Sequence, residues 1–253
     1  MFDTATILAV AGTFLIAGTV KGVIGLGLPT VSLALLTVAI GLPQAMALLL
    51  VPSFVTNLWQ AMVGGNGRAI LRRLWPFLGM ATVTVWLGAN ALTRVDLALL
   101  SALLGLLIVA YATVSLAGRH FAVTGRKEVW VGPLVGSVNG ILTGMTGSFV
   151  VPGVMFLQAI GLPRDWLIQA MGMLFTVSTL ALAFALQENK LLTADLGALS
   201  AAALVPAVVG MVVGQRIRHR LSERLFRRVF FIALLVLGTY IIATALFGGK
   251  PAP

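Results

Sequence analysis

The sequence has 253 residues, of which 59% are hydrophobic and only 9% are charged, and its mean hydropathy is +1.06. A soluble domain cannot cover so much apolar side chain, so the composition indicates a polytopic membrane protein. The net charge of +10 comes mainly from arginines in a few short segments, which favours positive-inside topology over a nucleic-acid partner, and the lack of cysteine excludes disulfides and thiolate metal sites.

The first apolar run, residues 5–40, is interrupted by Lys21-Gly22-Val23-Ile24-Gly25-Leu26-Gly27-Leu28-Pro29. Three glycines within six residues, followed by a proline that has no backbone N–H, predict a break in the helix. Non-helical backbone at membrane depth needs protein or a water-filled cavity around its polar groups, so the break indicates the wall of a site. The two pieces are short, which favours a broken or re-entrant helical hairpin.

The first half continues with three predicted spans and a polar stretch, and then the pattern restarts. The spans are 44–63, 74–92 and 97–117, and the polar stretch is 118–128. The stretch from Asn139-Gly140 to Pro152 resembles the first break, and Ile40-Gly41-Leu42-Pro43 recurs as Ile160-Gly161-Leu162-Pro163. Spans 166–186, 196–214 and 229–247 follow. The sequence therefore predicts an all-α membrane protein with two transmembrane repeats, 1–128 and 129–253, each of four segments and each starting with a broken hairpin.

Loop charges predict that the two repeats have opposite orientations. Segment 68–73 is basic, whereas its counterpart 187–195 has one lysine and two acids. Conversely, 93–96 is nearly neutral, whereas its counterpart 215–228 has six arginines. If basic loops are cytoplasmic, the chain is an inverted-topology repeat in the cell inner membrane. All basic loops stay inside only if each hairpin starts and ends on one side, which places both termini outside the cytoplasm.

Two interpretations of Lys21 are open. Its ammonium either extends to the headgroups at the end of the first segment or neutralises an anion beside the break. The counterpart position holds Asn139, which is neutral but able to donate hydrogen bonds. Asn57, in the flanking span, is either an interhelical hydrogen-bonding residue or a substrate contact.

The glycines of the two breaks also have two interpretations. Small residues allow helices to approach closely, but two corresponding breaks favour half-helices whose N-terminal N–H groups bind an anion. Hydroxyl groups near the second break would add donors. The candidate substrate-binding residues are Lys21, Gly22, Gly25, Gly27, Asn57, Asn139, Gly140, Thr143, Gly144, Thr146, Gly147 and Ser148, with Pro29 and Pro152 at the helix breaks.

The chain resembles the sulfite exporter TauE/SafE family over about residues 5–247. The resemblance rests on the first break, its weaker repeat in the second half, the two Gly-Leu-Pro turns, and Gly214 before a basic amphipathic loop. The resemblance implies an integral inner-membrane carrier of small sulfur-containing anions such as sulfite, sulfoacetate or other organosulfonates. It implies no enzyme activity and no cofactor. The family's glycine and proline positions carry over to Gly22, Gly25, Gly27 and Pro29, and to Gly140, Gly144, Gly147 and Pro152.

The expected function is therefore export of such anions by alternating access at a midplane site between the two broken helices. The expected partners are the anion and the lipid bilayer, with no nucleic acid, and an oligomer is left open. One alternative is a carrier of another small organic anion. A second is a non-transporting scaffold or accessory subunit that docks through the basic loop 215–228, which is also suited to anionic lipid. A membrane enzyme lacks support, because no catalytic or metal-spaced cluster exists and His120 and His219 both fall in charged loops.

Overall fold

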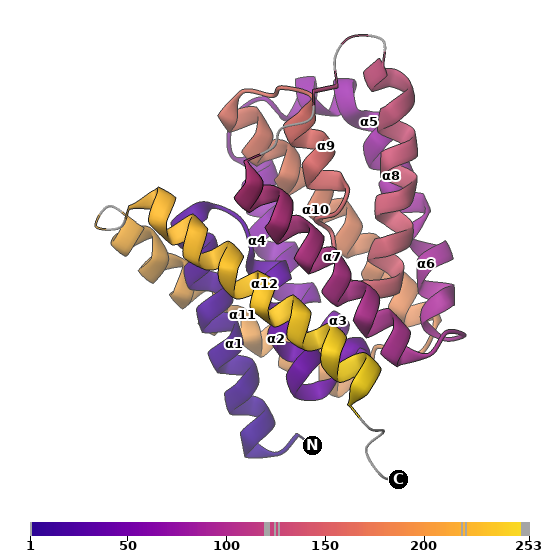
Figure 1. Ribbon diagram of the computed structural model, residues 1–253, viewed down its shortest axis with the longest axis vertical. Coiled ribbons are helices and arrows are strands. Elements are labelled where there is room, and N and C mark those ends of the chain that lie inside the picture. The colour runs from indigo at the N-terminus through magenta and orange to yellow at the C-terminus, as the bar shows by residue number, and fades with distance from the viewer. Residues whose placement is uncertain are drawn as a thin grey trace.

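The structure is a computed structural model that describes residues 2–118, 122–123, 125, 127–218, 220 and 222–248, and every regular element in these ranges is an α-helix (Figure 1). The first half contains α1 (Thr4–Ile24), α2 (Leu28–Ile40), α3 (Leu42–Leu48), α4 (Leu50–Met62), α5 (Gly67–Val83), α6 (Val85–Leu92) and α7 (Leu97–Ala117). The second contains α8 (Lys127–Thr146), α9 (Gly153–Ala159), α10 (Arg164–Glu188), α11 (Ala194–Arg218) and α12 (Glu223–Phe247). Five helices are long and apolar enough to cross a membrane, and the bent pair α3–α4 makes a sixth candidate. The predicted all-α, multi-pass fold is confirmed.

The helices are longer than the predicted spans where their ends are polar. The span predicted at 97–117 is α7 without change. The span predicted at 74–92 is instead divided into α5, which begins at Gly67, and α6, which ends at Leu92, and it is not among the candidate membrane spans. The last span begins at Glu223 instead of 229, because Ser222 caps α12 by accepting a hydrogen bond from the N–H of Leu225. Hydropathy detects only the apolar part of a helix whose charged end projects beyond the hydrocarbon region.

Each broken element is a hairpin that begins and ends on one side of the molecule. Helix α2 returns toward the end where α1 starts, so that Gly41 shares a groove with Leu97 at the start of α7 and Thr244 near the end of α12. Helix α8 starts at the opposite end, and α9 returns there, where the N–H of Val123 donates to the carbonyl of Ala159 at 2.9 Å. Figure 1 shows the start of α1 and the end of α12 on the same side of the molecule. This arrangement is consistent with the predicted inverted repeat.

Glycines bring α1 into backbone contact with α11. A Cβ atom on Gly18 would lie 2.1 Å from the carbonyl oxygen of Ala207, and one on Gly22 would lie 2.2 Å from that of Met211. The two helices therefore pack with no side chain between them at these positions. In a bilayer, where apolar side chains gain little by leaving lipid, such close packing is a main source of helix association.

The second half repeats this contact with α8 against α5 and α6. A Cβ atom on Gly140 would lie 2.6 Å from the carbonyl oxygen of Ala81, and one on Gly144 would lie 2.1 Å from that of Val85. The first helix of each half thus packs on the second-last element of the other half.

The last helices of the two halves, α7 and α12, run antiparallel. A Cβ on Gly105 would lie 2.7 Å from the carbonyl oxygen of Gly238. Tyr111, further along α7, meets Phe231, which comes earlier along α12, with ring centroids 5.3 Å apart. Equivalent elements therefore point in opposite directions, as an inverted repeat requires.

The span predicted at 44–63 is bent by 44° between α3 and α4. Pro52 has no N–H, so the carbonyl of Leu48 lacks a donor within its own helix. Ser200 of α11 supplies it: its hydroxyl donates to Leu48 at 2.8 Å and accepts from the N–H of Val51 at 3.1 Å. A residue of the other half thus satisfies the backbone that the bend exposes.

Charged residues divide between the two ends of the molecule. The end where α5, α8, α10 and α12 begin, here named the basic end, carries Arg68, Arg72, Arg73, Lys127, Arg164, Arg216, Arg218, Arg220, Arg224, Arg227 and Arg228. The opposite end carries Arg94, Lys190, Asp3, Asp96, Glu188 and Asp195. Arg119, His120, Arg126 and His219 lie outside the described residues. Positive-inside topology predicts that the basic end faces the cytoplasm.

Single cysteines test this orientation on a clean background, because the chain has no cysteine. We expect a membrane-impermeant thiol reagent to label Thr93→Cys in intact cells. Ser222→Cys, at the basic end, should react only after the membrane is permeabilised. Labelling of Ser222→Cys from outside intact cells would reverse the predicted topology.

The α1–α11 contact predicts opposite effects of one substitution at two positions of α1. Gly18→Ala places a methyl group against the Ala207 backbone, so we expect it to lower the free energy of unfolding by about 1–3 kcal/mol. Gly12→Ala has nothing within 4 Å of its new Cβ, so the gain in helix propensity should leave it at least as stable as wild type. Thermal unfolding in detergent measures both, and equal melting temperatures would refute the packing role of Gly18.

Candidate functional site

The first break joins α1 to α2 through Gly25, Leu26 and Gly27. Gly25 ends α1 with a φ of 80°, and its N–H donates to the carbonyl of Lys21 at 2.8 Å. Gly27 has a φ of 106°, a left-handed value that glycine adopts without strain. Pro29 lies in the first turn of α2, where a missing N–H breaks no helical hydrogen bond. The helix therefore breaks at the predicted position.

Lys21, one turn before this break, is only 5% exposed. Its ammonium donates to the side-chain oxygen of Asn57 and, at 3.2 Å, to the hydroxyl of Thr56, both on α4. These partners are neutral, and no acid among the described residues pairs with Lys21. The side chain therefore stays inside the protein and does not extend to the headgroups. A buried ammonium without a counter-charge is unfavourable, which makes Lys21 a candidate functional residue.

Two further polar groups on α4 have no hydrogen-bond partner among the described residues. They are the side-chain N–H₂ of Asn57, which is fully buried, and the hydroxyl of Ser53, one turn earlier on the same face. We name Lys21, Ser53, Thr56 and Asn57 the Lys21 cluster. It combines an ammonium, an amide donor and a hydroxyl, which is a donor set suited to an oxyanion.

The second break holds its own hydroxyl groups in internal hydrogen bonds. Helix α8 ends at Gly147, whose φ is 72° and whose N–H donates to the carbonyl of Thr143 at 2.7 Å. The Thr143 hydroxyl donates to the carbonyl of Ser148 at 2.9 Å, and the Thr146 hydroxyl accepts from the N–H of Ser148 at 3.3 Å. The hydroxyl groups of Thr143 and Thr146, two of the predicted donors, therefore fix the loop itself.

Asn139 also supports the second break. Its side-chain oxygen accepts from the N–H of Gly153 at 2.9 Å, which occupies the first N–H of α9, just after Pro152. Because α9 has only seven residues and this N–H is taken, the second break offers no open helix end for an anion. The side-chain N–H₂ of Asn139 has no partner among the described residues, like that of Asn57.

The helix ends also revise the correspondence between the two breaks. Gly25 and Gly147 both end a helix in the left-handed conformation, and each donates to the residue four positions earlier, Lys21 or Thr143. Lys21 therefore corresponds to Thr143 and not, as the sequence suggested, to Asn139. The expected register is displaced by one helical turn.

The physical reason for the displacement is the spacing of small residues in α8. Gly136, Gly140 and Gly144 recur every helical turn, so they match Gly18 and Gly22 of α1 in more than one register. Only the position of the helix end distinguishes between these registers. In the corrected register Gly22 corresponds to Gly144, and both lie against the backbone of a partner helix. Gly22, Gly140 and Gly144 thus have the close-packing role that was one of their two interpretations.

A small enclosed cavity of about 10 Å³ lies between the two breaks. Its lining residues are Leu26, Gly27 and Thr30 at the first break, Val150 and Val154 at the second, Tyr111 of α7, and Met171 and Phe175 of α10. Such a volume holds about one water molecule. Lys21 is not among the lining residues. Sequence analysis missed Thr30, Tyr111 and Met171 because each lies in an uninterrupted apolar segment.

The amides that flank the breaks mostly connect helices. Gln60 of α4 donates to the carbonyl of Ile168 at 2.8 Å, and Gln169 of α10 donates to the carbonyl of Ala61 at 2.8 Å. These bonds join the two halves where equivalent elements meet, so both residues are interhelical contacts.

Coupling between Lys21 and Asn57 can be measured in a double-mutant cycle. Lys21→Met and Asn57→Leu should each lower the free energy of unfolding by about 1–3 kcal/mol, because each leaves a buried partner unsatisfied. We expect the double variant to lose less than the sum of the two, with a coupling energy of about 0.5–3 kcal/mol from thermal unfolding. Additive losses would contradict a direct contact.

Comparison with known proteins places this architecture in a family. A family model described as sulfite exporter TauE/SafE matches residues 10–241, which include both breaks and the Lys21 cluster. No curated protein and no solved structure gives a significant match. Proteins of the matched family are transporters and not enzymes. The chain, a multi-pass membrane protein with two broken hairpins, therefore belongs to the sulfite exporter TauE/SafE family of membrane transporters.

Proposed function

We propose that the protein exports small sulfur-containing oxyanions, such as sulfite, sulfoacetate or other organosulfonates, across the cell inner membrane. The observation that carries this proposal is Lys21, a buried ammonium whose described partners are all neutral. A bound anion would supply the missing counter-charge and so relieve an unfavourable buried cation. The family supports the substrate class.

The Lys21 cluster suits the shape of a sulfite or sulfonate group. Such a group presents three oxygens, and the cluster offers three kinds of donor: the Lys21 ammonium, the free N–H₂ of Asn57 and the hydroxyl of Ser53. Charge-assisted hydrogen bonds from buried donors are stronger than neutral ones. On the other half, the free N–H₂ of Asn139 is available to a second oxygen-rich surface of the substrate.

Alternating access would come from one hairpin repeat rocking against the other. The cavity between the breaks is closed around a space smaller than the substrate, so binding requires the two hairpins to separate. Gly25, Gly27 and Gly147 give each hairpin a joint at its tip. Lys21 lies one turn before the first break and hydrogen-bonds to α4. An anion that binds the Lys21 cluster would therefore change the contact between this break and α4.

The membrane potential is sufficient to drive this export. The described acids lie at helix ends, loops or caps, and none is placed in the middle of a span as a proton-coupling site would need. A negative interior favours outward movement of an anion by about 2.3 kcal/mol per charge per 100 mV. We therefore propose facilitated, electrogenic export.

Ligand-dependent thermal stability of the purified protein tests the substrate class. The panel contains sulfite, sulfoacetate, other sulfonates, acetate and phosphate, each with wild type, Lys21→Met and Lys190→Met. At 100 times its dissociation constant a ligand should add about 2.7 kcal/mol of stability. We expect melting shifts with sulfur anions only, lost in Lys21→Met and kept in Lys190→Met, which removes an exposed lysine. Each shift is measured against the ligand-free variant, and the lack of any shift in wild type would refute the proposal.

A further inference from the structure

We infer that the groove between the end of α7 and the start of α12 is an anion vestibule, through which the transported oxyanion approaches the breaks from the basic end. This inference rests on the proposed function and adds a second binding site to it. The site is separate from the Lys21 cluster, and its chemistry is recognition of a sulfonate or similar oxyanion by arginine.

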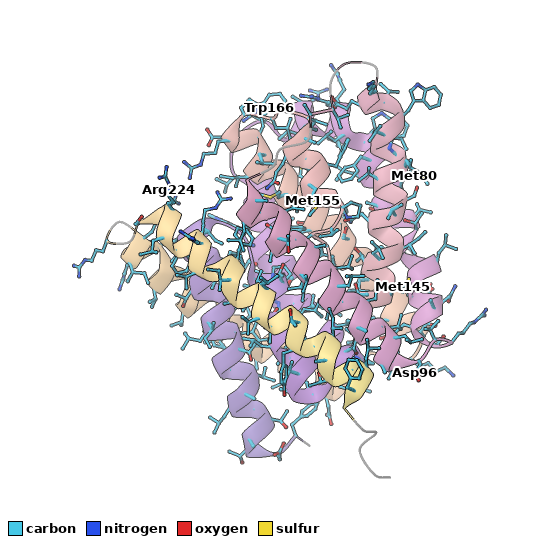
Figure 2. All side chains as sticks on the ribbon, viewed as in Figure 1. Met80, Asp96, Met145, Met155, Trp166 and Arg224 are labelled. Carbon is cyan, nitrogen blue, oxygen red and sulfur yellow. The ribbon has the colours of Figure 1, made fainter. Side chains whose placement is uncertain are left out.

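The groove is large, open and basic. It has a volume of about 800 Å³ and is lined by Arg224, Arg227 and Arg228 of α12 and by Ser115 of α7, with Phe231 at its inner side. Figure 2 labels Arg224 where α12 begins, at the outer end of the helix. The three arginines are spaced by three and one residues, so they share one face of the helix.

The three arginines have no acidic partner among the residues whose side chains the structure describes. None of the three forms an ion pair with a described residue, whereas Arg73 at the same end makes two hydrogen bonds of 2.8 Å to Glu128. Like charges on adjacent turns repel each other, so the cluster is stabilised when an anion binds. The planar guanidinium matches the paired oxygens of a sulfonate or phosphate group.

A pair of aromatic rings links this groove to the enclosed cavity at the breaks. Phe231 lines the groove and meets the ring of Tyr111 edge-on, with centroids 5.3 Å apart. Tyr111 in turn lines the enclosed cavity. The neighbouring Phe230 lies close to Gly27, the glycine of the first break, at 3.3 Å from an added Cβ. A movement of the first break would therefore displace Phe230 and the adjacent pair of rings, Phe231 and Tyr111.

The other end of the same helix pair has a groove without charge. It holds about 310 Å³ between the start of α7 and the end of α12. Its lining includes Gly41, Gln44, Ser101 and Tyr240 but no aspartate, glutamate, lysine, arginine or histidine. The two grooves lie at opposite ends of α7 and α12. An anion is therefore concentrated in the groove at the basic end and meets no charged side chain in the lining of the other groove.

The same oxyanion chemistry could come from an anionic phospholipid. Leu225 and Val229 of α12 are exposed beside the groove, where they can contact acyl chains. The exposed side chains of Leu116 and Ile232 also line the groove. We favour the free anion because Phe231, at the inner side of the groove, contacts Tyr111 of the enclosed cavity. The experiment separates the two sources.

A cysteine in the groove reports directly on its preference for anions. We compare the rates at which Ser115→Cys reacts with 2-sulfonatoethyl and 2-(trimethylammonium)ethyl methanethiosulfonate, which differ in charge, in lipid-free detergent. Thr93→Cys, at the other end, corrects for intrinsic reactivity. The anionic reagent should be favoured at least five-fold, and Arg227→Gln with Arg228→Gln should remove this preference. The matched control, Arg216→Gln with Arg218→Gln, removes equal charge outside the groove and should retain it.

Competition identifies the occupant. Sulfoacetate should slow modification by the sulfonate reagent. An unchanged preference in the Arg227→Gln, Arg228→Gln variant would overturn the vestibule. Protection by phosphatidylglycerol in nanodiscs, without protection by sulfoacetate in detergent, would also overturn it and assign the groove to lipid.

Transport separates this inference from the proposed function. In liposomes of zwitterionic lipid, the Arg227→Gln, Arg228→Gln variant should raise the KM for sulfoacetate at least five-fold at low salt, with an unchanged maximal rate. The difference should shrink at high salt, which screens exposed charges. A KM equal to that of wild type would overturn the vestibule. A wild type that shows the reagent preference but moves no anion would contradict the proposed function and leave the anion site in place.

Discussion

The structure depends on one constraint: backbone N–H and C=O groups that leave a helix at membrane depth must find partners inside the protein. Both breaks meet it with the same device, a left-handed glycine that donates back into the helix it ends, at Gly25 and Gly147. The bend between α3 and α4 meets it differently, through the hydroxyl of Ser200 on a helix of the other half. The interruptions therefore connect rigid helices and have hydrogen-bonded backbone, so a hairpin can move about them without leaving polar groups unpaired.

The same constraint explains why the two halves share an architecture but differ in chemistry. In the second half, Thr143 and Asn139 use their side chains to hold the loop and the start of α9. In the first half the break is shorter and is satisfied by backbone alone, so Lys21 remains free to contact α4. The second half thus supplies a break whose side chains hydrogen-bond within the break, and the first half supplies a buried cation. A site between two such halves is asymmetric, although the helices around it repeat.

Charge also divides the molecule along its length. Arginines without an acidic partner among the described side chains line the groove at the basic end, a groove without charged lining residues lies at the opposite end, and the buried Lys21 lies one turn before the first break. An anion that moves from the basic end would meet exposed, screened charges first and a desolvated charge later. Weak, long-range attraction at the entrance and stronger contact at depth are suited to a carrier, because a tight site at the surface would slow release.

The sequence alone determined the membrane class, the positions of the breaks and the uneven distribution of arginine. These features follow from local properties: apolar length, glycine and proline in a helix, and charge beside a span. Tertiary structure alone decided the register between the halves, because Gly136, Gly140 and Gly144 repeat at the helical period and match in several ways. It also decided that Lys21 binds α4, that Tyr111 and Thr30 close the cavity, and that Arg227 and Arg228 border a groove. These are contacts between segments far apart in the chain, and no local pattern encodes which faces of two apolar helices will meet.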